Sequence, residues 1–129
     1  MSLRSPLGRV RGLGSAKEGV NHWWAQRMTA LALVPLAVWF VISLLGMTGA
    51  DHAAVKAWAG SPVVAALLIL LIAATFYHAY LGLQVVIEDY VHSEAWKLFA
   101  LLAVKAAAWL LAILGVVSVL VLLLGDAPA

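Results

Sequence analysis

Three long apolar runs, separated by short polar stretches, form the main pattern of this chain. A helix needs about 20 apolar residues to cross the hydrocarbon core of a membrane, and each run is that long. None of the runs alternates with period two, and an open sheet cannot satisfy its backbone groups in lipid. The pattern therefore predicts an all-α integral membrane fold with three transmembrane helices, at about residues 28–48, 62–88 and 97–124.

Residues that favour turns and helix ends lie between the apolar runs. Gly46 and Gly49 follow the first run, and Ser61-Pro62 provides the N-cap residue and first-turn proline that open many helices. Pro35 lies inside the first run, where membrane helices tolerate proline. We therefore expect three helices joined by short polar connections.

The composition of the chain excludes most soluble functions. Of its 129 residues, 65% are hydrophobic and 11% are charged. Soluble domains are about half apolar and about a quarter charged. So few charges cannot cover the surface of a soluble enzyme or a nucleic-acid-binding domain, and a disordered tail would not be this apolar. The chain has no cysteine, which excludes disulfides, thiolate metal sites and cysteine nucleophiles.

The chain divides into a basic polar segment, residues 1–25, and a membrane anchor, residues 26–129. An Arg-rich, acid-poor start also occurs in organellar transit peptides. This stretch is short, rich in glycine and without clear amphipathicity. These properties favour a segment held on the cytoplasmic face of a bacterial inner membrane.

Lysine and arginine are unequally distributed over the two sides of the three predicted spans, and this predicts the orientation. With three spans, the N-terminal segment and the second connection lie on the same side, and the opposite side carries only Lys56. The N-terminus is therefore expected on the cytoplasmic (or matrix) side, with the C-terminus opposite. The basic residues on the N-terminal side are Arg4, Arg9, Arg11, Lys17, Arg27 and Lys97.

His78 is the clearest candidate for chemistry, because ionisable side chains inside a membrane span are rare. Imidazole is a common haem ligand and helix bundles hold haem between facing helices, so His78 can act as an axial ligand to haem iron. A lone histidine is more often hydrogen-bonded to a facing helix, and this alternative stays open. The other histidines fall near or beyond the predicted helix ends, so a second ligand at this depth would come from another chain. They are His22, His52 and His92.

Helical geometry places three further residues on the face of His78. At about 100° per residue, Gly82, Val85 and Asp89 fall on that face. Gly82 lacks a side chain one turn from the imidazole, so either a flat macrocycle or another helix can come close there. Asp89 lies about 16 Å along the helix axis from His78, which places it at the cytoplasmic interface.

Glu88, Asp89 and Tyr90 form a compact polar group where the second helix leaves the membrane. The simpler interpretation is a solvated helix end, with Tyr90 at the membrane interface. The functional interpretation is a site for a lipid-soluble quinone. A phenol can donate a hydrogen bond to a quinone carbonyl, and a nearby carboxylate can relay protons.

Two basic residues near the spans have simpler explanations. Arg27, at the start of the first helix, can bind a lipid phosphate, a haem propionate or a neighbouring subunit, and lipid phosphate is favoured. Lys105 lies about two turns into the third helix, from which its long side chain can reach the cytoplasmic interface.

The segment HAYLGLQVVIEDYVH, which begins at His78, resembles the second-helix motif of the D subunit of succinate dehydrogenase, the small membrane anchor of respiratory complex II. That family has a histidine, a glycine four residues on, and an Asp-Tyr pair eleven and twelve residues on. Here these positions are His78, Gly82, Asp89 and Tyr90. The stretch WWAQRMTALALVPL, residues 23–36, resembles the start of the first helix in bacterial members, and the resemblance extends over most of the chain.

The resemblance implies a redox function that the residues alone leave open. It implies that this chain forms half of a heterodimeric helical bundle with a cytochrome b-type C subunit, and that the two share one haem b. His78 would be the axial ligand on the haem iron, Tyr90 would hydrogen-bond ubiquinone, and Asp89 would support that quinone site. No catalytic residue of its own is expected in this chain.

The resemblance also implies the partners. Electrons from succinate would pass through a flavoprotein subunit with FAD and an iron–sulfur subunit with its clusters to ubiquinone, linking the tricarboxylic acid cycle to the respiratory chain. No activity is expected from this chain alone, and its other contacts would be with membrane lipid. Two alternatives stay open: a fumarate reductase membrane anchor, and a non-redox scaffold or transporter subunit.

Overall fold

The computed structural model of this chain describes residues 6–10 and 19–125, and these residues form helices and turns without a strand. The expected all-α fold is confirmed. Three of the helices are long and apolar enough to cross a membrane, as the three apolar runs predicted. In chain order the helices are α1 (Pro6–Val10), α2 (Gly19–Gly46), α3 (His52–Ala59), α4 (Pro62–Tyr90) and α5 (Glu94–Leu124).

The long helices extend further than the apolar runs. α2 begins at Gly19 instead of near residue 28, so the helix includes residues 19–27 that precede the apolar run. α5 begins at Glu94, and this carboxylate pairs with the ammonium group of Lys97 one turn later at 3.5 Å. Polar and charged residues therefore continue the helices beyond the length that the hydrocarbon core requires.

The basic segment 1–25 is described only in part. α1 and the first turns of α2 belong to it. Three of the basic residues on which the expected orientation depends, Arg4, Arg11 and Lys17, lie outside the described residues.

A short helix occupies the first connection, where the sequence predicted only a polar link. Asp51 is the N-cap of α3, and its carboxylate accepts a hydrogen bond from the backbone N–H of Ala54 at 2.8 Å. Gly49 has a φ of 84°, a left-handed conformation that glycine adopts at little cost. The turn at Gly49 and the cap at Asp51 together start a new helix shortly after α2 ends.

The expected start of the second span is found at the expected place. Pro62 is the first residue of α4 and Ser61 is its N-cap residue. The Ser61 hydroxyl donates to the carbonyl of Trp58 at 2.9 Å, so it holds the end of α3 and not the first turn of α4. α2 continues through Pro35 without interruption, as membrane helices allow.

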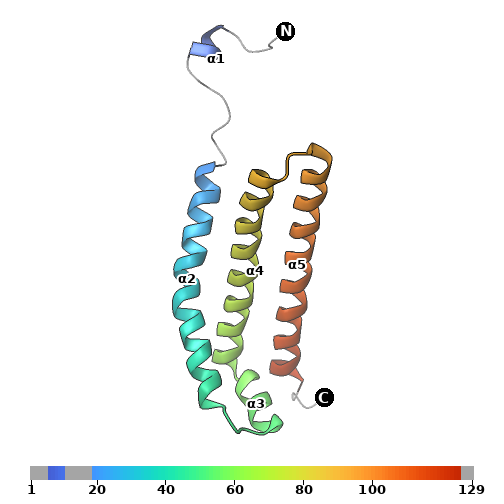
Figure 1. Cartoon of the computed structure of the whole chain (residues 1–129). Helices are drawn as coiled ribbons and strands as arrows, with labels where there is room; N and C mark the ends of the chain where they lie inside the picture. Colours follow the sequence, from blue (N-terminus) through green and yellow to red (C-terminus); the bar gives the residue numbers. More distant parts are fainter. Residues whose placement is uncertain (1–5, 11–18, 126–129) are drawn as a thin grey trace.

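The three long helices lie side by side in one layer, with α4 in the middle (Figure 1). α4 packs against both α2 and α5, and within the described part of the chain the backbones of α2 and α5 do not come close to each other. α3 lies across the end of the layer and packs against α4 and α5. One layer leaves two broad faces of the long helices uncovered by other described elements.

The most closely packed region lies at the α3 end of this layer. Trp39 of α2 and Trp58 of α3 stack there, with ring centroids 6.3 Å apart and an interplanar angle of 25°. The larger side chains surround a small cluster of buried residues, so α3 joins all three long helices at this end. The buried residues of the cluster are Ala59, Ala65, Leu68 and Val119.

Two glycines allow backbones to come close near this core. A Cβ atom at Gly60 would lie 2.7 Å from the carbonyl oxygen of Leu122, and one at Gly115 would lie 3.1 Å from Cγ2 of Ile72. Small residues permit this kind of approach between membrane helices, where packing replaces the hydrophobic driving force. The position of α5 against α3 and α4 therefore depends on the missing side chains at Gly60 and Gly115.

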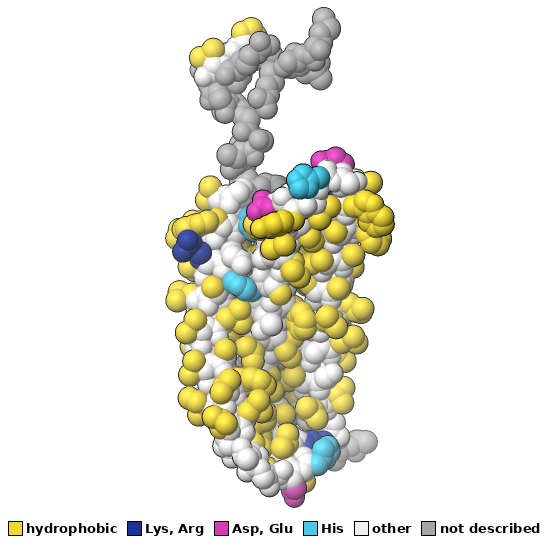
Figure 2. Space-filling view, viewed as in Figure 1, with side chains coloured by type: hydrophobic (Ala, Val, Ile, Leu, Met, Phe, Trp, Pro, Cys, Tyr) yellow, Lys and Arg dark blue, Asp and Glu magenta, His cyan; other side chains and the backbone are white. Residues whose placement is uncertain are grey.

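Most apolar side chains of the layer are exposed. α2 contains no buried residue, and few residues of α4 and α5 are buried. Figure 2 shows hydrophobic side chains along the length of the molecule, with the charged side chains gathered toward its ends. In a membrane such a surface is covered by lipid or by another apolar chain.

Candidate functional site

His78 lies half-buried in α4, and each of its ring nitrogens has a polar neighbour on α2. Thr29 Oγ1 is 2.9 Å from His78 Nδ1. The side-chain nitrogen of Gln26 is 3.3 Å from His78 Nε2. Within this chain, His78 is therefore hydrogen-bonded to a facing helix. This is one of the two possibilities that the sequence left open, and haem ligation is the other.

A polar stripe on α2 presents these groups to α4. His22, Gln26 and Thr29 are four and three residues apart, so they share one face of the helix. Reasoning from the sequence missed Gln26 and Thr29, because it weighed only the ionisable residues within the spans. The signal was nevertheless present as polar residues at helical spacing in a largely apolar helix.

Two buried polar atoms of this stripe have no hydrogen-bond partner among the described residues. They are Oε1 of Gln26 and Nε2 of His22. An unsatisfied buried polar atom costs about 1–3 kcal/mol. Such atoms mark positions where a polar group from water, a ligand or another chain would be stabilised.

Gly82 faces α2, as His78 does. A Cβ atom at Gly82 would lie 3.5 Å from the side-chain nitrogen of Gln26. From the sequence, either a macrocycle or a neighbouring helix could occupy the space at Gly82, one turn from the imidazole. In this chain, the side chain nearest to that position comes from the neighbouring helix α2.

A polar cleft of ≈ 650 Å³ lies between the first turns of α2 and the last turns of α4. Asn21 and His22 line it from α2, and Gln84 and Glu88 line it from α4. Gln84 also donates a hydrogen bond to the Glu88 carboxylate at 2.8 Å. The polar end of the layer is therefore hollow, in contrast to the packed end at α3.

Asp89 and Tyr90 are the last residues of α4, and both are exposed. Tyr90 is 77% exposed, which leaves its ring and its hydroxyl accessible. α4 runs without a break from His78 to Tyr90. At 1.5 Å per residue the two residues are about 18 Å apart along the axis. One rigid element therefore carries the candidate haem ligand and the candidate quinone group.

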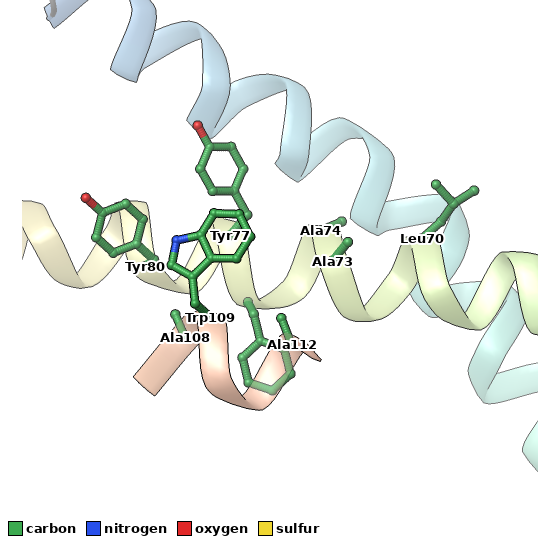
Figure 3. Close-up of a pocket in the computed structure, with 9 residues that line it drawn as sticks. Leu70, Ala73, Ala74, Tyr77, Tyr80, Ala108, Trp109 and Ala112 are labelled. Carbon is green, nitrogen blue, oxygen red and sulfur yellow. The ribbon is translucent and has the colours of Figure 1, made fainter. Parts of the chain in front are cut away.

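An apolar groove of ≈ 580 Å³ lies between α4 and α5. Figure 3 shows Trp109 of α5 beside Tyr77 and Tyr80 of α4 in this groove. Trp109 is 61% exposed, so it does not belong to the core of this chain. The two tyrosines also line the polar cleft, and they therefore separate the apolar groove from the cleft.

The two basic residues singled out in the sequence are both exposed. The guanidinium of Arg27 lies 4.4 Å from the ring centroid of Trp23, a cation–π contact. Lys105 lies on α5. The roles expected for Arg27 and Lys105 stay predictions.

Within residues 6–10 and 19–125, no group of three or more His, Cys, Asp or Glu side chains is arranged to hold a metal ion. Haem ligation differs from such a site, because the porphyrin supplies the equatorial ligands and the protein supplies only axial ones.

Comparison with known proteins identifies the family. A family model described as the succinate dehydrogenase/fumarate reductase transmembrane subunit matches residues 1–124. This chain belongs to that family. A succinate dehydrogenase hydrophobic membrane anchor subunit of Rickettsia bellii (strain RML369-C) is 33% identical over 117 residues, covering 91% of this chain and 94% of that protein. The protein of the same name from Paracoccus denitrificans is 30% identical over 129 residues, covering 95% of this chain and 100% of that protein.

Membership in the succinate dehydrogenase/fumarate reductase transmembrane subunit family agrees with the fold. The similar proteins are membrane anchor subunits, and this chain has three apolar helices that can span a membrane. It is therefore a multi-pass membrane protein. The resemblance to succinate dehydrogenase membrane anchors is confirmed by the family match over residues 1–124.

Proposed function

We propose that this chain is the hydrophobic membrane anchor, or D, subunit of a succinate:ubiquinone oxidoreductase. The family match supports the proposal. The relatives named succinate dehydrogenase hydrophobic membrane anchor subunit, which match over nearly their full length, support it too. The chain would form one half of a helical bundle that a C subunit completes. Its single layer of long helices, with most apolar side chains exposed, is the surface expected of such a half.

The observation that carries the proposal is the position of His78 inside a membrane-spanning helix. Ionisable side chains within a span are costly, and where they occur they mark functional sites. We propose that His78 supplies one axial ligand to a haem b, and that a histidine of the C subunit supplies the other.

The residues around His78 fit this role. Thr29 lies against Nδ1, which leaves Nε2 as the nitrogen for iron. The neighbour of Nε2 is the flexible carboxamide of Gln26, whose oxygen has no hydrogen-bond partner among the described residues. The carboxamide can therefore move away from His78 Nε2 without breaking a hydrogen bond at its own oxygen. When bound, the haem would accept and release single electrons.

We propose that Tyr90 donates a hydrogen bond to a carbonyl of ubiquinone and that Asp89 supports this site. The exposed phenol at the end of α4 combines an apolar ring with a polar hydroxyl, which suits an amphipathic ligand. Ubiquinone takes up two protons with two electrons, and the Asp89 carboxylate can orient the phenol or pass on a proton. The other quinone contacts would come from the C subunit and the iron–sulfur subunit.

The resemblance to the membrane anchors of succinate dehydrogenase implies the soluble partners. In that family, electrons from succinate pass through a flavin and iron–sulfur clusters that the other subunits hold. A flavoprotein subunit with FAD and an iron–sulfur subunit would therefore dock on the membrane side that carries Tyr90. The excess of lysine and arginine in the N-terminal segment supports a cytoplasmic location for this side in a bacterial inner membrane.

The visible absorption spectrum of the intact complex, purified from wild-type and His78→Ala cells, tests the proposal. We expect a b-type haem in the wild-type complex and its loss or altered ligation in His78→Ala. His52→Ala is the matched control, because His52 is exposed on α3 at the other end of the layer, and it should keep the wild-type spectrum. A wild-type complex without haem, or an unchanged spectrum in His78→Ala, would contradict the ligand role.

A fumarate reductase anchor is the second candidate, because the family description names both enzymes. The relatives named above are succinate dehydrogenase subunits, which favours succinate oxidation. The quinone that co-purifies with the complex separates the two. Ubiquinone supports the first candidate, and a low-potential menaquinone supports the second.

A further inference from the structure

We infer that Thr29 is a positioning residue for His78. Its hydroxyl oxygen accepts a hydrogen bond from Nδ1–H of the imidazole, which fixes the tautomer whose Nε2 lone pair is free for haem iron. The inference rests on the proposed haem function and adds to it a residue on a different helix, α2.

The hydrogen bonds of Thr29 determine which atom donates. A hydroxyl has a single hydrogen. Thr29 Oγ1 lies 2.8 Å from the carbonyl oxygen of Ala25 and 3.0 Å from that of Gln26, and both atoms can only accept. A threonine within a helix commonly gives its hydrogen to these carbonyls of the preceding turn. The oxygen lone pairs then face His78 Nδ1 at 2.9 Å, and the ring nitrogen must donate.

The contact on the other ring nitrogen indicates the same tautomer. In the structure the side-chain amide of Gln26 presents its nitrogen, and not its oxygen, to His78 Nε2 at 3.3 Å. An amide nitrogen can only donate, so in this orientation Nε2 accepts. A neutral imidazole carries one hydrogen, and placing it on Nδ1 satisfies both contacts at once. A metal-bound imidazole has the same arrangement, with the metal on one nitrogen and a hydrogen-bond acceptor on the other.

Thr29 therefore supplies an acceptor at a depth where water is scarce. In the hydrocarbon core every polar hydrogen needs a partner from protein. The bond to Nδ1 fixes the orientation of the ring against the α2 backbone. It also raises the basicity of the ligand, which stabilises ferric over ferrous iron. Loss of this bond should therefore raise the haem midpoint potential.

The test compares the haem of the purified complex in wild type, Thr29→Val, Thr29→Ser and Thr75→Val. Valine keeps the shape of threonine without the hydroxyl, and serine keeps the hydroxyl. Thr75 is exposed on α4 and serves as the control. We expect a higher midpoint potential and altered ferric EPR g-values in Thr29→Val alone. Each tenfold decrease in the stabilisation of ferric over ferrous haem raises the midpoint potential by about 59 mV, as for any one-electron couple.

The outcomes separate this inference from the proposed function. A wild-type complex with haem and an unshifted potential in Thr29→Val overturns the role of Thr29 and leaves haem ligation intact. An equal shift in Thr29→Ser overturns it too, because the effect would then come from packing. If the Thr29→Val complex assembles without haem, the haem content of Thr29→Ala is measured as well. Loss of haem in Thr29→Ala with haem retained in Thr29→Ser supports the role of the hydroxyl. Normal haem in Thr29→Ala contradicts it. A wild-type complex without haem would contradict both haem ligation by His78 and the positioning role of Thr29.

Discussion

At the scale of single residues, the polar cluster of His78, Gln26 and Thr29 joins two otherwise apolar helices. Hydrogen bonds between membrane helices contribute about 0.6 kcal/mol on average and seldom more than about 2 kcal/mol. Such a small gain does not account for a histidine within a membrane span. The cluster is better explained by what the imidazole can bind than by the stability that it adds.

Tyr90→Phe should depress quinone reduction selectively, because it removes the hydroxyl and keeps the ring. A hydrogen bond contributes about 0.5–1.5 kcal/mol net. Since about 1.4 kcal/mol is a factor of ten, we expect succinate–ubiquinone reductase activity to fall about twofold to twelvefold. Succinate oxidation by an artificial acceptor that bypasses the membrane subunits should stay at the wild-type level in the same preparation.

Tyr77→Phe is the matched control for this substitution, because it makes the same chemical change on the same helix, about 20 Å from Tyr90 along the axis. It should leave both activities unchanged. Equal loss of both activities in Tyr90→Phe would mean that the phenol supports assembly and not the quinone.

At the scale of the helices, the sequence predicted the spans well because long apolar runs leave few other structures in lipid. It did not predict α3, since the helix depends on a left-handed turn at Gly49 and a cap at Asp51, which are signals of one residue each. The position of Asp89 and Tyr90 near the end of α4 could be predicted, because the second apolar run stops just before them. The contacts of Thr29 and Gln26 with His78 could not, because they depend on how two helices face each other.

Gly60→Ala should destabilise the α3 end of the layer. The new methyl group would lie 2.7 Å from a backbone carbonyl of α5, so the helices must move apart. Overpacking of this kind costs about 1–3 kcal/mol. The change should appear as a lower thermal unfolding temperature of the purified complex, followed by tryptophan fluorescence.

Gly46→Ala is the control for this effect, because nothing lies within 4 Å of a Cβ atom there. Its unfolding temperature should equal or slightly exceed that of wild type. If Gly60→Ala unfolds at the wild-type temperature, α3 is not packed against α5 as the structure shows.

At the scale of the whole molecule, one end of the layer is packed and the other is open. The buried cluster and the stacked tryptophans join the helices at α3. The opposite end holds the polar cleft and the exposed Tyr90. This division suits a subunit whose helices are held together at one membrane surface and whose partners bind at the other.

The orientation of this division can be measured, because the chain has no cysteine and single-cysteine variants give an unambiguous signal. A membrane-impermeant maleimide should label Ala50→Cys, in the connection before α3, from outside intact spheroplasts. Ser93→Cys, between α4 and α5, should react only after the membrane is opened. Labelling of Ser93→Cys from outside would place the Tyr90 end on the wrong side for the soluble electron donors.

In the proposed function, this chain anchors a succinate-oxidising complex to the membrane and connects it to ubiquinone. The most direct measurement is succinate-driven ubiquinone reduction by the complex purified in mild detergent through a tag on this chain. We expect the flavoprotein, the iron–sulfur subunit and the C subunit to co-purify and to reduce ubiquinone with succinate. A tagged chain that purifies without succinate-oxidising activity would contradict this function.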